Sequence, residues 1–222
     1  MSIPLYFAMS WEASQSHSAA YKAQLGFGFQ KDGTLFVPEQ SILNAPIVLN
    51  DAIVPQCMPG KNTINRLAGL CRRGCFFDFE RPASNWSIRL FKELQAYLDA
   101  NSLLAVPQEY AKFAPHAAVI VSVQDLPNNW TKFCKKQQEA YKKWIWEIIP
   151  YKKSVKMPVG KIKGGTIKNA NCCCRQTEDQ ILYYDTMETI LSKLEIAQYY
   201  GCIAGIGLSI ELDCLKKTAN HN

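Results

Sequence analysis

The chain has 222 residues, enough for one sizeable domain with a full hydrophobic core, and its 48% hydrophobic and 20% charged residues are typical of a globular protein. No apolar run is long enough to span a bilayer, so we expect no membrane partner. The formal net charge of +6 comes from scattered lysine pairs and not from one basic run, which favours a solvated surface over a nucleic-acid partner.

Apolar runs of strand length alternate with amphipathic runs of helical length along the chain. Strands are predicted at residues 3–9, 34–38, 45–50, 75–79, 102–107, 117–123, 145–149 and 202–210, with a further extended segment at 180–184. Helices are predicted at residues 14–24, 62–73, 84–98, 130–143 and 186–200. Residues 151–184 are expected to form an irregular insertion or hairpin before the last helix and strand.

Continuous apolar strands separated by helices indicate a parallel sheet that is covered on both faces. Eight such strands predict an α/β fold, a compact single-domain (β/α)8 TIM barrel over residues 1–222. Such barrels usually have ~250 residues, so some helices must be trimmed, and little room remains for a helix after the last strand. A doubly wound open sheet is the alternative. No G-x-G-x-x-G or P-loop motif follows a strand, which argues against nucleotide binding. No cofactor is expected.

The stretch GCFFDFERPAS contains two acids at the end of a buried strand. Alternate residues of a strand share a face, so Asp78 and Glu80 point the same way, roughly 7 Å apart. One interpretation is an acid/base pair at the mouth of a barrel. The other is a helix N-cap with a salt bridge to Arg81.

The carboxyl ends of the strands of such a barrel meet at one rim, where chemistry takes place. Polar and aromatic residues follow several predicted strands at this rim. Those chosen as candidate substrate contacts are Trp11, Asp51, Gln124, Asp125, Tyr151 and Glu211.

The segment RGCFFDFE resembles the D-G-x-D-x-D-x-E signature of family 18 glycoside hydrolases, which include chitinases, endo-N-acetylglucosaminidases and spore-cortex hydrolases. Gly74, Asp78 and Glu80 match this signature, whereas Arg73 and Phe76 stand at its first two aspartates. In the family the signature closes the fourth barrel strand.

The carboxyl-terminal part carries a second resemblance to this family. The matching residues are Tyr184, Asp185, Lys193, Tyr199, Tyr200, Gly201 and Gly205, which look like a Y-D, Lys and G-x-x-G block that leads into the eighth strand. AVIVSVQD would be the sixth strand and WIWEIIPY the seventh. Together the two resemblances cover roughly residues 70–212.

The resemblance implies hydrolysis of a glycan that contains N-acetylglucosamine. Glu80 would be the general acid, and Asp78 would orient the substrate's 2-acetamido group, which acts as internal nucleophile. Gln124 stands where the family has a tyrosine, before Asp125, and its amide can still donate a hydrogen bond. With Tyr184, these two residues are possible substrate contacts.

The chain departs from the family at the floor of the sugar site. The register of the last strand places Ser209 where the family has a tryptophan. An aromatic floor would need Trp11, Trp146 or Tyr151 at the rim. The alternative function is therefore a catalytically degenerate barrel that binds carbohydrate or serves a structural role. A third reading, a nucleic-acid-binding domain, needs the lysine pairs to gather on one face.

The nine cysteines and the amino terminus bear on location and metals. MSIPLYFAMSWEAS has no positively charged start, so it predicts no signal peptide and a cytoplasmic location. The cysteines in apolar contexts are predicted to be reduced core residues, namely Cys71, Cys75, Cys134 and Cys202. The run Cys172-Cys173-Cys174 has no C-x-x-C spacing or nearby histidine, so we expect a hairpin strand and no metal site.

Overall fold

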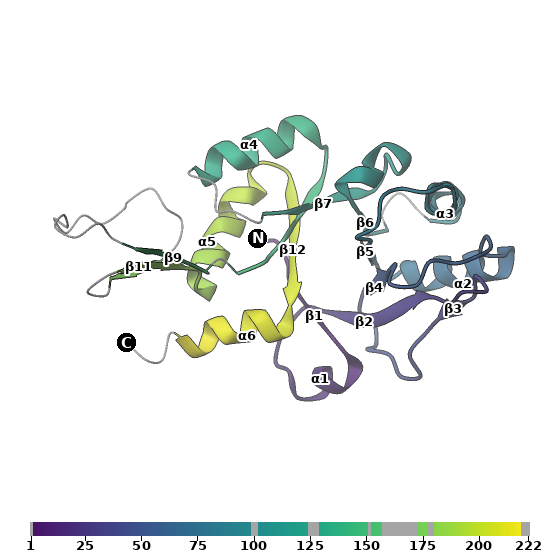
Figure 1. The fold of residues 1–222 in the computed structure, drawn as a ribbon, viewed down its shortest axis with the longest axis horizontal. Coiled ribbons are helices and arrows are strands. Elements are labelled where there is room, and N and C mark those ends of the chain that lie inside the picture. Colours follow the sequence, from purple (N-terminus) through teal and green to yellow (C-terminus); the bar gives the residue numbers. More distant parts are fainter. Residues whose placement is uncertain are drawn as a thin grey trace.

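The structure is a computed structural model that describes residues 2–98, 102–123, 129–150, 152–156, 173–176 and 180–218. Eight parallel strands form a closed barrel (Figure 1). In chain order they are β1 (Leu5–Met9), β2 (Lys22–Phe29), β4 (Ile47–Asn50), β5 (Cys75–Asp78), β6 (Leu104–Pro107), β7 (Ala118–Ser122), β8 (Trp144–Glu147) and β12 (Cys202–Leu208). The pairing of β1 with β2 closes the ring. The predicted (β/α)8 TIM barrel is confirmed.

Helices cover the outside of the barrel, but not after every strand. They are α1 (Trp11–Ser16), α2 (Lys61–Cys71), α3 (Asn85–Gln95), α4 (Trp130–Ala140), α5 (Met187–Gln198) and α6 (Ser209–Thr218). A 3-10 helix, η1 (Gln108–Phe113), follows β6, and a short antiparallel strand, β3 (Leu35–Phe36), follows β2. Figure 1 shows α2 and α3 on one side of the barrel and α4 and α5 on the other. This trimmed helical layer explains how a short chain completes the barrel.

Period-two alternation divides the core into an inner and an outer part. The inner cluster fills the barrel with one or two residues from each strand: Ala8, Ala23, Val48, Phe76, Ala105, Ala118, Ile145, Ala204 and Ile206. The neighbouring strand residues point outward and pack against the helices, as Phe77 does against Phe91 with ring centroids 4.7 Å apart. A residue two positions after an inner-cluster residue therefore also points into the barrel, nearer to its carboxyl end.

The amino-terminal quarter differs from the prediction. The helix expected at residues 14–24 is wrong, because α1 ends at Ser16 and the second barrel strand starts at Lys22. Because this strand contains polar residues and glycines, it lacks the hydrophobic periodicity by which a strand is predicted. Its Gln24 is buried, and its side chain exchanges hydrogen bonds with Gln40 O (2.8 Å) and Ile42 N (2.7 Å). The segment predicted as the second strand, residues 34–38, contains only β3.

The carboxyl-terminal end also differs from the prediction. The last strand ends at Leu208, and the chain continues into α6, which buries Leu212 and Leu215 against the outer core. The expectation of little room for a final helix was therefore wrong.

A separate antiparallel sheet lies between β8 and α5. It contains β9 (Lys152–Lys156), β10 (Cys173–Gln176) and β11 (Gln180–Tyr184), in the order β10-β11-β9. Cys173 and Cys174 lie on β10, whereas Cys172 lies outside the described residues. In the part of the chain that the structure describes, no helix is both long and apolar enough to cross a bilayer.

The four cysteines that were predicted in the core are free and buried. The pKa of the Cys134 thiol and that of the Cys202 thiol are each raised to about 12, and burial is the largest cause of both shifts. These thiols are therefore protonated at physiological pH and unreactive.

Candidate active site

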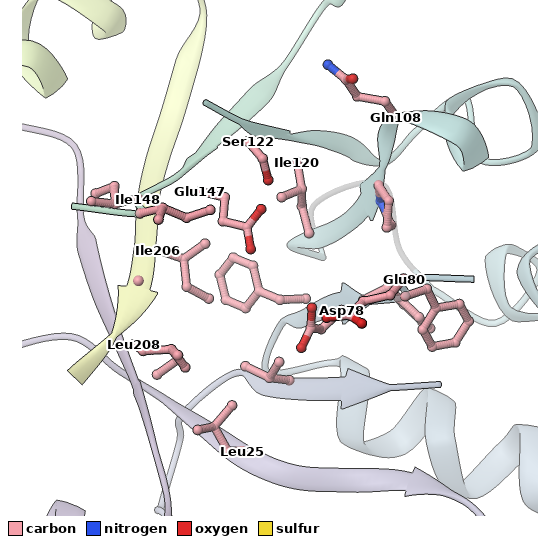
Figure 2. Close-up of a pocket in the computed structure, with 18 of the residues that line it drawn as sticks. Leu25, Asp78, Glu80, Gln108, Ile120, Ser122, Glu147, Ile148, Ile206 and Leu208 are labelled. Atoms are coloured by element: carbon pink, nitrogen blue, oxygen red, sulfur yellow. The ribbon is translucent and has the colours of Figure 1, made fainter. Parts of the chain in front are cut away.

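A pocket of about 650 Å³ opens at the carboxyl end of the barrel strands, where the predicted acids lie (Figure 2). Phe76, which belongs to the inner cluster, lines it together with aliphatic side chains from several strands. Five carboxylic acids also line it: Asp78, Glu80, Glu109, Glu147 and Glu211. No lysine, arginine or histidine is found among the described residues that line the pocket. The site is therefore a predominantly acidic cavity with an apolar wall.

The loop that carries Glu80 is held by Asp51. This carboxylate, which is 3% exposed, accepts hydrogen bonds from the backbone N–H groups of Glu80 (3.1 Å) and Arg81 (3.0 Å). The Arg81 guanidinium donates back to the carbonyls of Asp51 (3.1 Å) and Ala52 (3.2 Å), and Tyr110 Oη donates to the Arg81 carbonyl (3.0 Å). Five hydrogen bonds thus fix the backbone beside Glu80. Asp51 itself is not among the residues that line the pocket. Its role is to position Glu80, which does line it.

The second interpretation of GCFFDFERPAS, an N-cap with a salt bridge, does not describe what is observed. Ser84 caps α3, and Arg81 is directed to backbone carbonyls. No ion pair within the described ranges includes Asp78 or Glu80. Both side chains are exposed to the pocket, so their charges face the space that a ligand would occupy.

The electrostatics of the pocket favour the protonated form of two of its acids. Loss of hydration at the pocket wall, followed by the charges of Glu80 and Asp51, raises the pKa of Asp78 above its ordinary 3.8. Loss of hydration also has the largest effect on Glu147. Together with the charges of Asp78, Glu80 and Glu211, it raises the pKa of Glu147 above its ordinary 4.5. Raised carboxyl pKa values in a cleft are a mark of functional sites.

The raised pKa of Asp78 predicts how stability depends on pH. The folded protein binds this proton more tightly than the unfolded chain, so stability falls as pH rises from 3.8 through the raised value. We expect Asp78→Asn to increase the free energy of unfolding relative to wild type, by a margin that grows over this pH range. Urea denaturation at a series of pH values measures the margin. The exposed Glu139→Gln on α4, outside the pocket, is the matched control for a carboxyl-to-amide substitution. A margin for Asp78→Asn that shrinks with rising pH would contradict the argument.

Glu147 is a pocket residue that the sequence analysis missed. It was placed inside a strand expected at residues 145–149, but β8 ends at Glu147. Ile145 belongs to the inner cluster, so Glu147, two residues later, faces the pocket, while Trp144 and Trp146 face the outer core. The charge within the apolar run WIWEIIP was the signal that could have identified it.

Of the remaining predicted substrate contacts, some lie at the pocket and others do not. Glu211, in the first turn of α6, lines the pocket. Trp11, at the start of α1, and Tyr184, at the end of β11, are partly buried and are not among the described residues that line it. Three further predicted residues, Gln124, Asp125 and Tyr151, lie outside the described residues. Substrate contact by all of them stays a prediction.

The aromatic floor that a sugar site needs is not formed by Trp146. This side chain is buried between the barrel and its helices, with its ring centroid 4.6 Å from that of Trp130. Among the described lining residues the aromatic ones are Phe76, Phe77 and Phe79. Within the described part of the chain no group of His, Cys, Asp and Glu side chains is arranged to hold a metal ion.

A buried ion pair lies outside the barrel wall. Lys193 Nζ lies 2.5 Å from Asp185 Oδ1, and the two side chains are 1% and 2% exposed. The ammonium also lies 5.7 Å from the ring centroid of Trp130 and 5.8 Å from that of Trp146. Sequence resemblance singled out Asp185 and Lys193 separately, and the structure joins them. The pair joins the residue before the N-cap of α5 to the middle of that helix, beside the indole rings of Trp130 and Trp146.

Comparisons with known proteins identify the fold. No protein-family model matches the chain, and no curated protein matches it. The spore cortex-lytic enzyme SleL of Bacillus cereus superposes with a TM-score of 0.57 at 12% identity, covering 95% of this chain and 71% of that one. A chitinase from Chromobacterium violaceum gives 0.56 at 12% identity, covering 99% of both chains. A chitinase from Rhizomucor miehei gives 0.54 at 12% identity, covering 99% of this chain and 100% of that one. At these identities the likeness shows a shared barrel fold.

Proposed function

We propose that this protein is a glycoside hydrolase that acts on a glycan containing N-acetylglucosamine. The observation that carries the proposal is the pair Asp78 and Glu80 at the end of the fourth barrel strand. Both acids line an open pocket, and no described ion pair neutralises them. The resemblance to family 18 concerns these same residues, and the similar structures include two chitinases and a spore cortex-lytic enzyme.

The proposed mechanism is substrate-assisted and retains the anomeric configuration. Glu80 donates a proton to the glycosidic oxygen, which leaves with the electron pair of its bond to C1. The carbonyl oxygen of the 2-acetamido group bonds to C1 in its place, and Asp78 accepts a hydrogen bond from the acetamido N–H. Water then opens the cyclic intermediate and returns the proton to Glu80. The backbone N–H groups of Glu80 and Arg81 donate hydrogen bonds to Asp51, which hold the backbone at Glu80 in place during these steps.

The alternative is a degenerate barrel that binds carbohydrate without cleaving it. The wall of the pocket favours this reading, since of its described aromatic residues only Phe76 belongs to the inner cluster, while Phe77 and Phe79 pack against the helices and aliphatic side chains form much of the rest. Sugars commonly stack on exposed aromatic faces, whereas a site of this composition would bind them chiefly by accepting hydrogen bonds from their hydroxyl groups.

Hydrolysis of fluorogenic chitobiose and chitotriose substrates tests the proposal, with soluble muropeptides as a second substrate class. We expect release of the fluorophore, and proton NMR of the first product should show the anomeric configuration of the substrate. A protein that binds these glycans and cleaves none of them would support the degenerate barrel instead.

A further inference from the structure

The position of Glu147 makes it a neighbour of the proposed catalytic acids. It lies on β8, the seventh barrel strand, and Figure 2 shows its carboxyl group and that of Asp78 pointing into the same cavity from opposite sides. Its neighbours in the strand registers are Ser122 on β7 and Ile206 on β12, which carry no charge. The charged groups that act on it from the described part of the cavity are the carboxylates of Asp78, Glu80 and Glu211.

Loss of hydration, together with repulsion among these acids, favours a proton on Glu147. Three negative charges act on Glu147, and no described cation lines the pocket to offset them. Like charges that share a site cannot all ionise freely, so the group that feels most of them and is least hydrated holds its proton longest. Glu147 is only partly exposed, whereas Asp78 and Glu80 are exposed to the pocket. The raised pKa of Glu147 agrees with this geometry.

A protonated carboxyl group adds a hydrogen-bond donor to a pocket whose described lining is mainly carboxylates and apolar side chains. Carboxylates only accept hydrogen bonds, and a neutral carboxyl group can donate one. Ser122 offers a hydroxyl donor nearby, while the amide of Gln108 points away from the carboxylates (Figure 2). A sugar ligand has hydroxyl and acetyl carbonyl oxygens that need donors.

We propose that Glu147 is a further ligand-binding residue of this site, which in its neutral form donates a hydrogen bond to an oxygen of the bound sugar. The inference rests on the proposed glycan ligand, but not on its hydrolysis. Ionisation of Glu147 removes the donor and adds a further negative charge to a cavity that four other carboxylic acids line. Binding should therefore weaken as the pH rises through the ionisation of Glu147.

Titration calorimetry with N,N′-diacetylchitobiose, from about pH 4 to about pH 9, tests this pH dependence. In wild type we expect affinity to fall on the order of tenfold across the ionisation of Glu147, as loss of one buried hydrogen bond implies. Glu147→Gln keeps a donor that never ionises, so its affinity should remain near the low-pH wild-type value throughout. Glu147→Leu has no donor, so its affinity should be low at every pH. The exposed Glu139→Gln is the matched control and should follow wild type.

Several outcomes would overturn the inference. They are a Glu147→Gln affinity that falls with pH as in wild type, a Glu147→Gln affinity that is low at every pH, or no binding of the disaccharide by wild type. Carbon-detected NMR of the wild-type carboxyl groups gives a test without any variant, because a Glu147 midpoint at or below 4.5 also contradicts the inference. Binding without cleavage would reject the proposed hydrolase and leave the role of Glu147 standing, so the two failures are distinguishable.

Discussion

Replacement of Glu80 by glutamine is expected to abolish hydrolysis of fluorogenic chitobiose. The variant keeps the size of the side chain and its place in the pocket but cannot donate a proton to the glycosidic oxygen. General acid catalysis contributes about 10²-fold to 10⁴-fold to such reactions, and we expect kcat to fall by this factor. KM should change little, because binding of the sugar does not need the proton. Steady-state kinetics of wild type and Glu80→Gln measure both constants.

The structure indicates that Glu80→Gln tests catalysis without disturbing the fold. The Glu80 contact that holds the loop comes from its backbone N–H, and no described ion pair includes its side chain. Glu80→Gln should therefore fold and melt as wild type does, and the surface variant Glu139→Gln should keep full activity. Equal kcat for Glu80→Gln and wild type would remove Glu80 from the role of acid. Low activity with a lowered melting temperature would indicate damage to the fold.

Replacement of Lys193 by methionine is expected to destabilise the protein by about 3–5 kcal/mol, as the loss of one partner of a buried ion pair typically does. The variant keeps an unbranched side chain between Trp130 and Trp146 but removes the cation. Asp185 keeps its hydrogen bond from Thr189 Oγ1 (3.1 Å) but loses the ion pair that compensates its buried charge. Urea denaturation monitored by tryptophan fluorescence measures the loss.

The double variant Lys193→Met with Asp185→Asn separates charge from packing. Asparagine is neutral and can still accept the Thr189 hydrogen bond, so the double variant should be more stable than Lys193→Met alone. If packing of the lysine stem is the main contribution, the double variant will be at least as unstable as the single one. Because the pair lies outside the pocket, wild-type KM should persist in whatever fraction of either variant is folded.

Much of the barrel could be predicted because its signals are local. Continuous apolar strands such as CFF and AVIV, separated by amphipathic helices, require a parallel sheet covered on both faces. The same period-two rule placed Asp78 and Glu80 on one face, and both line the pocket. These features depend only on residues that are neighbours along the chain.

Other elements could not be predicted, because their stability comes from distant partners. The second barrel strand contains glycines and a buried glutamine, which is satisfied by a loop 16 and 18 residues away. The helix α6 was not predicted for a similar reason. Leu212 and Leu215 stabilise it only by packing on other strands and helices.

The sequence by itself determined the alternation of strands and helices, and hence the barrel and the paired acids at the end of its fourth strand. Tertiary structure alone decided which charges meet. Barrel closure brings Glu147 of the seventh strand opposite Asp78, turns Asp51 into a support for the Glu80 loop, and pairs Asp185 with Lys193. The physical reason is that hydrophobic periodicity acts between adjacent residues, whereas pKa values and ion pairs depend on distances through space.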